Sequence, residues 1–243
     1  MSPVTVVTGG SRGIGAATVR ALAEAGHDVA LCYRRDADAA ETVLRQVTAA
    51  GHRGVAVRAD TTNPDDVAHL FDLATQRLGE PTGLVNNAGV TSPIGPFVDL
   101  TLDDLRRVID VNLVGYVLCA QQAARRMRPG SAIVNVSSAA ATLGAPDEYV
   151  HYAAVKAATD TLTVGLAKEL GPRGIRVNAV SPGLIETDIH ASSGMPDRAT
   201  RLGPLVPLGR PGQPTEVADA IVWLLGPGAS YTSGAVLRIA GGR

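Results

Sequence analysis

Short apolar runs rich in β-branched residues alternate with segments of helical periodicity along almost the whole chain. We expect strands at 4–8, 29–33, 55–57, 132–136, 175–180 and 235–239, with one more ending within 84–89. Helices are expected after the first run, from about 64, and over about 37–50, 101–127, 149–170 and 214–223. Apolar strands joined by helices indicate parallel pairing with both faces covered. The alternation therefore predicts an α/β fold, with one doubly wound domain spanning residues 1–243.

The first turn of the chain is rich in glycine. Residues 4–8 run directly into Gly9, Gly13 and Gly15, and a helical pattern follows. Glycine permits unusual backbone dihedrals and lets the chain approach a ligand closely. The free N–H groups and the dipole of the next helix suit a pyrophosphate. Such a turn, taken alone, is equally compatible with a tight strand–helix connection that binds nothing.

Composition argues against several classes of protein. The formal net charge is −1, which gives no footprint for nucleic acid or for an anionic membrane surface. No apolar stretch approaches the roughly 20 residues that span a bilayer, and the N-terminus lacks the pattern of a signal peptide. Cys32 and Cys119 lie inside apolar runs, and neither they nor the five histidines have metal-ligand spacing. We therefore expect a cytoplasmic protein without a metal site.

Polar side chains follow three successive predicted strands. Asp60 and Thr61 come after the third strand, residues 86–89 end the fourth, and Ser137 and Ser138 follow the fifth. In open α/β sheets, ligands bind outside the carboxyl ends of the strands. Each group alone could cap a helix or form a turn, but three in succession favour a ligand crevice.

Tyr152 and Lys156 are four residues apart on the longest predicted helix. Side chains at this spacing lie on one face of a helix. A phenol with an ordinary pKa of about 10 is a poor base at neutral pH, but a nearby ammonium favours its phenolate. The pair is thus a candidate proton donor and acceptor for a carbonyl/alcohol couple. The alternative is an amphipathic pair on a solvated face.

The motifs, taken together in chain order, resemble those of the classical short-chain dehydrogenase/reductase family. They are Thr8-Gly9-x-x-x-Gly13-x-Gly15, Asn86-Asn87-Ala88-Gly89, Ser138, Tyr152-x-x-x-Lys156 and Pro182-Gly183. The resemblance covers essentially the whole chain and looks strongest to 3-oxoacyl-carrier-protein reductases and glucose dehydrogenases. It implies a Rossmann-type domain with a seven-stranded parallel sheet flanked by helices, a nicotinamide cofactor, a small-molecule carbonyl or alcohol substrate, and a homotetramer.

The resemblance also implies roles for individual residues. Tyr152 would be the general acid/base, Lys156 would lower its pKa, and Ser138 would hold the substrate oxygen. Asn112, within Asp110-Val111-Asn112-Leu113, would support a water-mediated proton relay. The residues implied to bind the cofactor are Gly9, Ser11, Arg12, Gly13, Ile14, Gly15, Arg34, Asp60, Thr61, Asn87, Ala88, Gly89, Tyr152, Lys156, Pro182, Gly183, Ile185 and Thr187.

One spacing departs from the family pattern. Ser138 lies fourteen positions before Tyr152, one more than the commonest spacing. An extra residue around 145–148 would absorb the difference, but it leaves Ser137 as the alternative to the favoured Ser138. His151, next to the tyrosine, is interpreted as a flank of the substrate pocket or a surface residue rather than a catalyst.

The end of the second strand bears on cofactor choice. NAD binders generally place an acidic residue there, roughly 20 residues beyond the glycines, to hold the ribose hydroxyls. This chain has Tyr33, Arg34 and Arg35 instead, with Arg12 in the glycine turn. Because an arginine fork suits a 2′-phosphate, we expect NADP(H) to be preferred over NAD(H). Asp36 weighs slightly against this, and Arg34 and Arg35 could merely decorate a solvated turn.

Residues 190–213 combine Gly, Pro, Ser and Arg with little periodicity, and we interpret them as a lid over the substrate. The sequence thus predicts an NADP(H)-dependent oxidoreductase that transfers hydride between nicotinamide and a carbonyl or secondary alcohol. Two alternatives remain open. One is a catalytically retired dinucleotide sensor, and the other is a nucleotide-sugar epimerase or dehydratase, which shares the Tyr-x-x-x-Lys pair.

Overall fold

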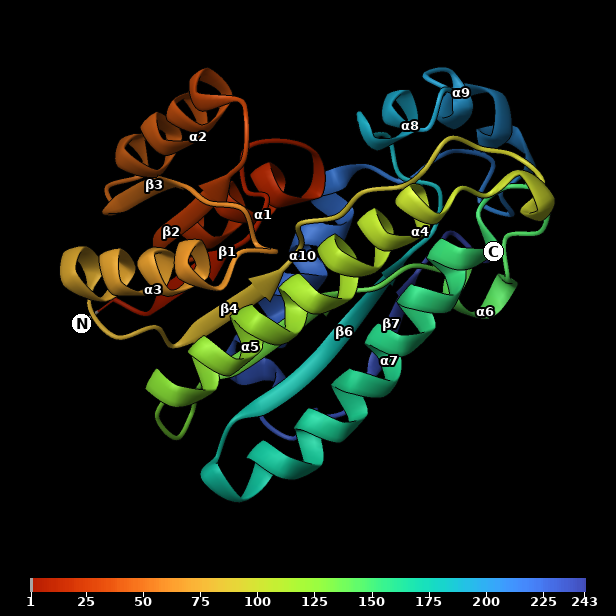
Figure 1. The fold of residues 1–243 in the computed structure, drawn as a ribbon. Coiled ribbons are helices and arrows are strands. Elements are labelled where there is room, and N and C mark those ends of the chain that lie inside the picture. Colours follow the sequence, from red (N-terminus) through yellow and green to blue (C-terminus); the bar gives the residue numbers. More distant parts are fainter. Residues whose placement is uncertain (1) are drawn as a thin grey trace.

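The protein folds around one seven-stranded parallel sheet (Figure 1). The structure is a computed structural model that describes residues 2–243, without the side chains of His190 and Ser192. The strands are β1 (Val4–Val7), β2 (Asp28–Tyr33), β3 (Gly54–Arg58), β4 (Gly83–Asn86), β5 (Ala132–Val136), β6 (Arg176–Pro182) and β7 (Val236–Ile239). Their order across the sheet is β3-β2-β1-β4-β5-β6-β7. The predicted α/β fold with a seven-stranded parallel sheet is confirmed.

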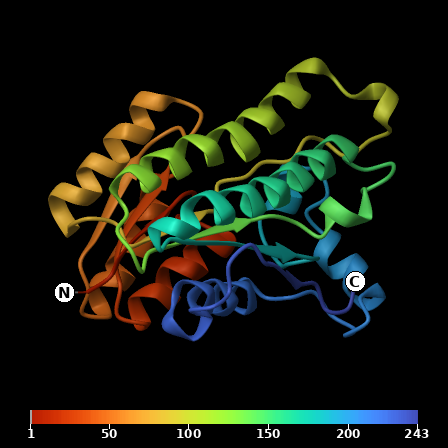
Figure 2. The same ribbon diagram turned by 90° about the horizontal axis from the view of Figure 1, so that it is seen from below.

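Helices cover both faces of the sheet, as the two ribbon views show together (Figures 1 and 2). One face carries α1 (Gly13–Glu24), α2 (Ala37–Ala49) and α10 (Pro214–Leu225), which pack in one apolar cluster with β1, β2 and β4 to β6. The other carries α3 (Pro64–Leu78), α5 (Gly115–Arg126) and α7 (Val150–Leu170), which pack in a second cluster. The sheet is therefore the middle layer of three.

The central strand β1 shows why helices must pack on both faces of the sheet. Val6 lies in one apolar cluster and Val7 in the other, and both are fully buried. Successive side chains of a strand point to opposite faces, so both faces of β1 bury valines. Each fully buried valine stabilises the fold by about 1.5–3 kcal/mol. The strand order reverses at β1, between β2 and β4, which opens a crevice at their carboxyl ends.

The helix expected over 101–127 contains one irregular turn. It forms as α4 (Leu102–Ile109), a π-helical turn (Asp110–Val114) and α5. Thr101 caps its start, because the Thr101 hydroxyl accepts a hydrogen bond from the Asp104 backbone N–H at 3.1 Å. Single π-helical turns are rare and occur frequently at functional sites. This turn contains Asn112.

The segment 190–213 is more structured than its sequence suggests. It holds α8 (Ile189–Ser192), which begins one residue earlier, and α9 (Arg198–Leu202), which both lie beyond the carboxyl end of the sheet in Figure 1. Its base is closed by backbone hydrogen bonds from Gly212 N to Leu184 O and from Glu186 N to Gly212 O, each 2.9 Å. Another short helix, α6 (Ala140–Leu143), was not predicted either. These helices have four or five residues, too few to give a periodic pattern.

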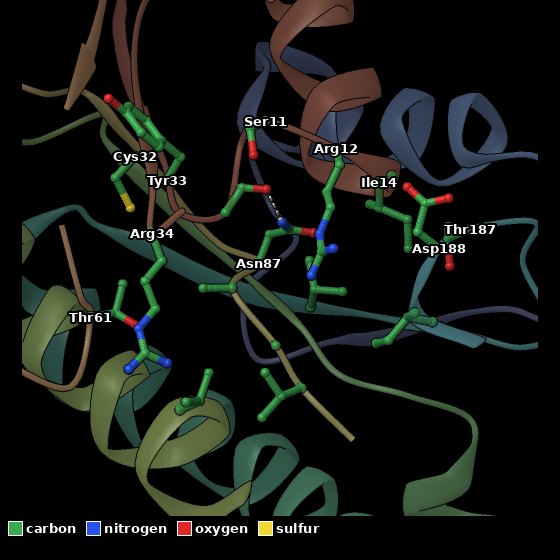
Figure 3. A pocket seen from close by; sticks show the side chains of 18 of the residues that line it. Ser11, Arg12, Ile14, Cys32, Tyr33, Arg34, Thr61, Asn87, Thr187 and Asp188 are labelled. Atoms are coloured by element: carbon green, nitrogen blue, oxygen red, sulfur yellow. Dashed lines mark hydrogen bonds between the residues drawn. The ribbon is translucent and has the colours of Figure 1, made fainter. Parts of the chain in front are cut away.

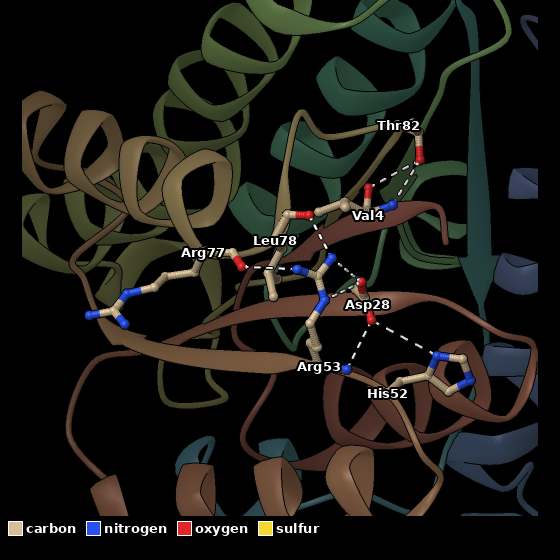
Figure 4. Close-up of polar contacts among 7 residues, drawn as sticks. All are labelled: Val4, Asp28, His52, Arg53, Arg77, Leu78 and Thr82. Atoms are coloured by element: carbon tan, nitrogen blue, oxygen red, sulfur yellow. Dashed lines mark hydrogen bonds and ion pairs between the residues drawn. The ribbon is translucent and has the colours of Figure 1, made fainter. Parts of the chain in front are cut away.

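A charged cluster closes the amino-terminal edge of the sheet (Figure 4). Asp28, whose side chain is only 4% exposed, accepts hydrogen bonds from Arg53 Nε at 2.9 Å and from Arg53 Nη2 at 2.5 Å. Arg53 also donates to the backbone carbonyls of Arg77 and Leu78, at the end of α3. Burial alone would raise the pKa of Asp28, but its contacts with Arg53 hold it below the usual value. The cluster joins β2, β3 and α3 at the end of the sheet opposite the crevice.

We expect Arg53→Ala to lower the free energy of unfolding by about 1–3 kcal/mol at neutral pH, because it leaves the buried Asp28 carboxylate without its partner. The loss is no larger because the Arg53 side chain is 60% exposed, so solvent partly screens its charge. Because the Asp28 pKa is depressed, this stabilisation is present above the ordinary aspartate pKa of about 3.9 and is lost as the pH falls below it. Urea unfolding at pH 7 and at pH 3 measures both effects.

Arg45→Ala is the matched control, because Arg45 is exposed and contacts only Thr42 of its own helix. It should change stability by less than about 0.5 kcal/mol. An Arg53→Ala loss that is equally large at pH 3 would contradict the assigned role of Asp28.

Candidate active site

The carboxyl ends of the strands surround a cavity of about 350 Å³. The glycine-rich turn forms one wall. Gly9 and Gly13 have φ angles of 63° and 52°, which favour glycine. A Cβ at Gly15 would lie 2.2 Å from the carbonyl oxygen of Gly9, so no other residue fits there without moving the turn. This wall offers backbone rather than side chains to a ligand, as a dinucleotide cradle requires.

The glycine turn is tied to the loop after β4. Asn87 donates from Nδ2 to the carbonyls of Thr8 at 2.9 Å and Gly9 at 3.1 Å. In return, the Thr8 hydroxyl accepts hydrogen bonds from the backbone N–H groups of Asn87 and Ala88. Figure 3 shows Asn87 beside the turn, with Ser11 and Arg12 along the same wall of the pocket. Thr8 and Asn87 therefore hold the glycine turn in shape.

Nearly all the residues singled out from the sequence line this one cavity. It contains Ser138, Tyr152 and Lys156, and all the predicted cofactor residues except Gly15. Gly15 instead packs against Gly9 inside the turn. Asn112 is fully buried behind the cavity and does not line it. The fold thus brings together groups that are scattered over residues 9–187 of the sequence.

At one end of the cavity, two predicted cofactor residues contact each other. Arg34 Nε lies 2.9 Å from Asp60 Oδ2, and the Thr62 hydroxyl donates to Asp60 Oδ1 at 2.8 Å. Burial raises the pKa of Asp60, but the hydrogen bonds from Thr62 and the charge of Arg34 outweigh it and lower the pKa below its usual value. Arg34 is 56% exposed and extends into the pocket in Figure 3, as does Arg12 from the glycine turn. The terminal nitrogens of Arg34 are left to face the cavity.

At the other end, Lys156 holds a buried position against β5 and α5. Its ammonium donates to the carbonyl of Val136 at 2.8 Å and to the Tyr116 hydroxyl at 3.3 Å. Tyr116, in turn, donates to Val136 O at 3.0 Å. Sequence reasoning missed Tyr116, although it lies four residues after Asn112 on the same continuous helix and could have been found by that spacing.

The two serines after β5 point to different partners. The Ser137 hydroxyl donates to the carbonyl of Lys156 at 3.2 Å, so it supports the backbone of α7. The Ser138 hydroxyl accepts a hydrogen bond from the Ala140 backbone N–H at 3.2 Å, lines the cavity and lies close enough to Tyr152 to lower the pKa of that phenol. The geometry therefore favours Ser138, as the sequence analysis did, for contact with a ligand.

Burial dominates the electrostatics of the tyrosine–lysine pair. It raises the pKa of Tyr152 well above the usual value, and the hydrogen bond from Ser138 only partly opposes this. Burial lowers the pKa of Lys156 to about 7, against the opposing charge of Asp160 one turn further along α7. At neutral pH, Tyr152 is thus a protonated phenol, ready to donate, and Lys156 is poised to gain or lose a proton.

Asn112 supports the floor of the site from the π-helical turn. Its Nδ2 donates to the carbonyls of Val90 and Val108, each at 2.9 Å. Its Oδ1 is buried and accepts no hydrogen bond from the described residues, and it faces Gly89, where a Cβ would lie 3.0 Å away. A buried acceptor of this kind is normally satisfied by water.

The loop after α6, where the extra residue between Ser138 and Tyr152 is expected, contains two non-glycine residues with positive φ angles. Ala145 and Asp147 have φ angles of 46° and 57°, in a region that costs non-glycine residues free energy. The loop therefore turns tightly, and Ser138 still reaches Tyr152. His151 is buried and hydrogen-bonded to Ser92 at 2.9 Å, so it is neither a surface residue nor a wall of the cavity.

Within residues 2–243 as described, no cluster of His, Cys, Asp or Glu could hold a metal ion. Nor is any of the described helices long and apolar enough to cross a membrane.

Known proteins resemble this chain over almost its whole length. The family model for enoyl-(acyl carrier protein) reductase matches residues 9–243. The chain is 45% identical to the uncharacterized oxidoreductase YgfF of Escherichia coli K12, over 99% of both chains. It is 42% identical to a cis-4-hydroxycyclohexanecarboxylate dehydrogenase of Sinomonas cyclohexanicum, over 98% of this chain and 95% of that one. It is 38% identical to a 3-oxoacyl-(acyl-carrier-protein) reductase of Synechocystis, over 98% of this chain and 96% of that one.

Among solved structures, a short-chain dehydrogenase of Burkholderia cenocepacia in complex with NADP superposes with a TM-score of 0.92. It is 38% identical and covers 99% of this chain and 97% of that one. The doubly wound sheet and the glycine-lined cavity define a dinucleotide-binding oxidoreductase. The chain belongs to the classical short-chain dehydrogenase/reductase family.

We expect Gly15→Ala to abolish dinucleotide binding, because the added methyl group would overlap the Gly9 carbonyl and push the turn apart. Titration of the intrinsic fluorescence with NADPH measures this. Gly165→Ala is the control, since Gly165 lies exposed in α7 with nothing near its Cβ position. It should bind NADPH normally and be more stable by about 0.5–1 kcal/mol. Normal binding by Gly15→Ala would contradict the proposed cradle.

Proposed function

We propose that this protein is an NADP(H)-dependent oxidoreductase that interconverts a carbonyl and a secondary alcohol, with Tyr152 as general acid/base. The observation that carries the proposal is the placement of Ser138, Tyr152 and the buried ammonium of Lys156 together in the glycine-lined cavity. Two similar proteins support it: the relative from Sinomonas is a cis-4-hydroxycyclohexanecarboxylate dehydrogenase, whose substrate is a secondary alcohol, and the Burkholderia structure contains NADP.

The residues of the cavity fit a nicotinamide dinucleotide. The turn of Gly9, Gly13 and Gly15 would receive the pyrophosphate, and residues 182–187 would lie at the nicotinamide end. When bound, the cofactor supplies the hydride for reduction or accepts it for oxidation. The protein's part is to bind the substrate oxygen, exclude water and move one proton.

Ser138 and Tyr152 would hold the substrate oxygen between them. In reduction, the protonated phenol of Tyr152 donates its proton to that oxygen as negative charge develops there. Lys156 lies with its ammonium 5.6 Å from the centre of the Tyr152 ring, and its positive charge stabilises the phenolate that results. In oxidation, the same phenolate takes the alcohol proton.

Asn112 would support the return of the proton from solvent. Its Oδ1, which has no hydrogen-bond partner among the described residues, is suited to hold a water molecule behind the cavity. Water held there could return a proton to the neutral Lys156 amine after the lysine has given one up, since its pKa of about 7 permits exchange in both directions. This is the relay role expected for Asn112.

Three further features belong to the proposal. Residues 190–213 act as the substrate lid of a single domain that spans residues 1–243.

The exposed apolar side chains of Phe97, Val98, Trp223 and Tyr231 suit burial between the subunits of a homotetramer, which light scattering would test. The buried, unpaired Cys32 and Cys119 suit the reducing cytoplasm.

Tyr152→Phe tests the chemical role directly. We expect it to fold and bind NADPH normally but to lose about 10²–10⁴-fold in kcat, because the acid/base is gone. The assay follows NADPH oxidation with a panel of oxoacyl thioesters, cyclohexanones and oxosteroids. In the unmodified protein, alcohol oxidation should rise with pH across neutrality, since the raised pKa of Tyr152 keeps the base form scarce.

Retention of more than about a tenth of the activity by Tyr152→Phe would exclude this assignment. Binding of NADPH without turnover of any panel member would favour the retired sensor, although such a protein would be expected to have lost Tyr152 or Lys156. Conversion of a nucleotide sugar without net NADPH consumption would favour the epimerase.

Arg34→Ala tests the choice of cofactor. A charge-assisted hydrogen bond contributes about 1.5–3 kcal/mol. The variant should therefore bind NADPH about ten- to hundredfold more weakly, while its affinity for NADH stays nearly unchanged. The measurement is kcat/KM for both cofactors. Arg45→Ala is the control, because Arg45 is exposed on α2 and does not line the cavity. A wild-type preference for NADH would refute the NADP(H) assignment.

A further inference from the structure

A second, smaller cavity of about 70 Å³ adjoins the first. Ser138, Pro182 and Gly183 line both, so the two meet at the serine that contacts Tyr152. Five further lining residues are apolar, and four are polar: Glu148, Tyr149, Arg198 and Arg243. The cavity therefore leads away from the reacting oxygen toward a group of charged side chains.

Arg198 is the most deeply buried charge of this group. It comes from α9, within the segment 190–213, and its side chain is only 4% exposed. Its Nη2 lies 2.7 Å from Glu148 Oε2, and its guanidinium stacks 5.7 Å from the centre of the Tyr149 ring. Tyr149 in turn meets the Tyr152 ring edge-on, with 5.3 Å between centres. Arg198 is thus packed against the acid/base through a single intervening ring.

The guanidinium keeps donors that no described residue uses. Arginine has five N–H donors, and only Nη2 of Arg198 donates a hydrogen bond, to Glu148. Buried donors are normally paired, and an unpaired buried charge is costly. Because Arg198 lines the cavity, its remaining donors are available there. The geometry calls for an acceptor inside the cavity.

The charge and size of the cavity define that acceptor. Glu148 is already engaged, since its Oε2 accepts the hydrogen bond from Arg198. Burial raises the pKa of Tyr149, and the charges of Arg198 and Arg243 oppose this, so both cations act at this place. The volume is about twice the ~30 Å³ of a water molecule in the liquid, enough for a planar group of three heavy atoms.

We propose that this cavity binds a carboxylate of the substrate, with Arg198 as the residue that recognises it. The substrate would then be an oxo acid, or the matching hydroxy acid. Its carboxylate accepts hydrogen bonds from Arg198, while its carbonyl oxygen lies at Ser138 and Tyr152. The inference rests on the proposed function and adds the substrate class to it.

The test compares acids with their neutral esters. The substrates are 2-oxopentanoate, 4-oxopentanoate and 4-oxocyclohexanecarboxylate, each beside its methyl ester, with kcat/KM measured under NADPH. We expect at least one acid to exceed its ester by about tenfold or more. Arg198→Met should lower kcat/KM for that acid by about ten- to hundredfold and change the ester little. Arg201→Met, three residues further along α9 and exposed, should leave both unchanged.

A second variant serves if Arg198→Met fails to fold. Glu148→Gln keeps Arg198 and removes the negative charge that competes for it, so the ratio of acid to ester should rise. Esters reduced at least as well as every acid would overturn the proposal, as would an unchanged or lower ratio in Glu148→Gln. Equal losses for acids and esters in Arg198→Met would mean that the ion pair only anchors the segment 190–213. Reduction of no compound at all would instead count against the proposed function.

Discussion

The mutual hydrogen bonds between Thr8 and Asn87 are the contact on which the site depends. They join the ends of β1 and β4, the two neighbouring strands from which the chain departs toward opposite halves of the sheet. At this point the glycine turn must leave room for a ligand, so it cannot be stabilised by its own side chains. The loop after β4 supplies the missing contacts from outside. One asparagine thus lets a turn of three glycines keep a single shape.

A buried polar network extends this support toward α7, which carries the two residues proposed to be catalytic. Asn86 donates to Asn135 in the neighbouring strand at 3.0 Å, and Asn135 donates to Thr163 of α7 at 2.9 Å. Such groups are costly to bury unless they are paired, so they accept only one packing of α7 on the sheet. Because Tyr152 and Lys156 project from the same helix, the network also fixes the position of these two side chains relative to β5. Rigid placement of this kind is what proton transfer over one hydrogen bond requires.

The sequence was sufficient for the sheet, for the long helices and for most of the residues that line the main cavity. Their signals are local: apolar runs, glycine spacing and the four-residue interval between Tyr152 and Lys156. What it could not supply depends on contacts between distant residues. The pairing of Arg34 with Asp60 spans 26 positions and that of Glu148 with Arg198 spans 50, and neither leaves a pattern within one segment. The short helices α6, α8 and α9 have no periodicity to detect, and the π-helical turn differs from α-helix by one hydrogen-bonding step.

The loop after α6 contains two residues in the left-handed backbone conformation. This loop turns tightly at Ala145 and Asp147, between Ser138 and Tyr152, which both line the main cavity. The same turn forms one wall of the smaller cavity, through Ala145 and Glu148. Lengthening or shortening this loop would therefore reshape the substrate side while leaving the proton donor in place. The loop is a point where a chain of this fold could acquire a new substrate without rebuilding its catalytic apparatus.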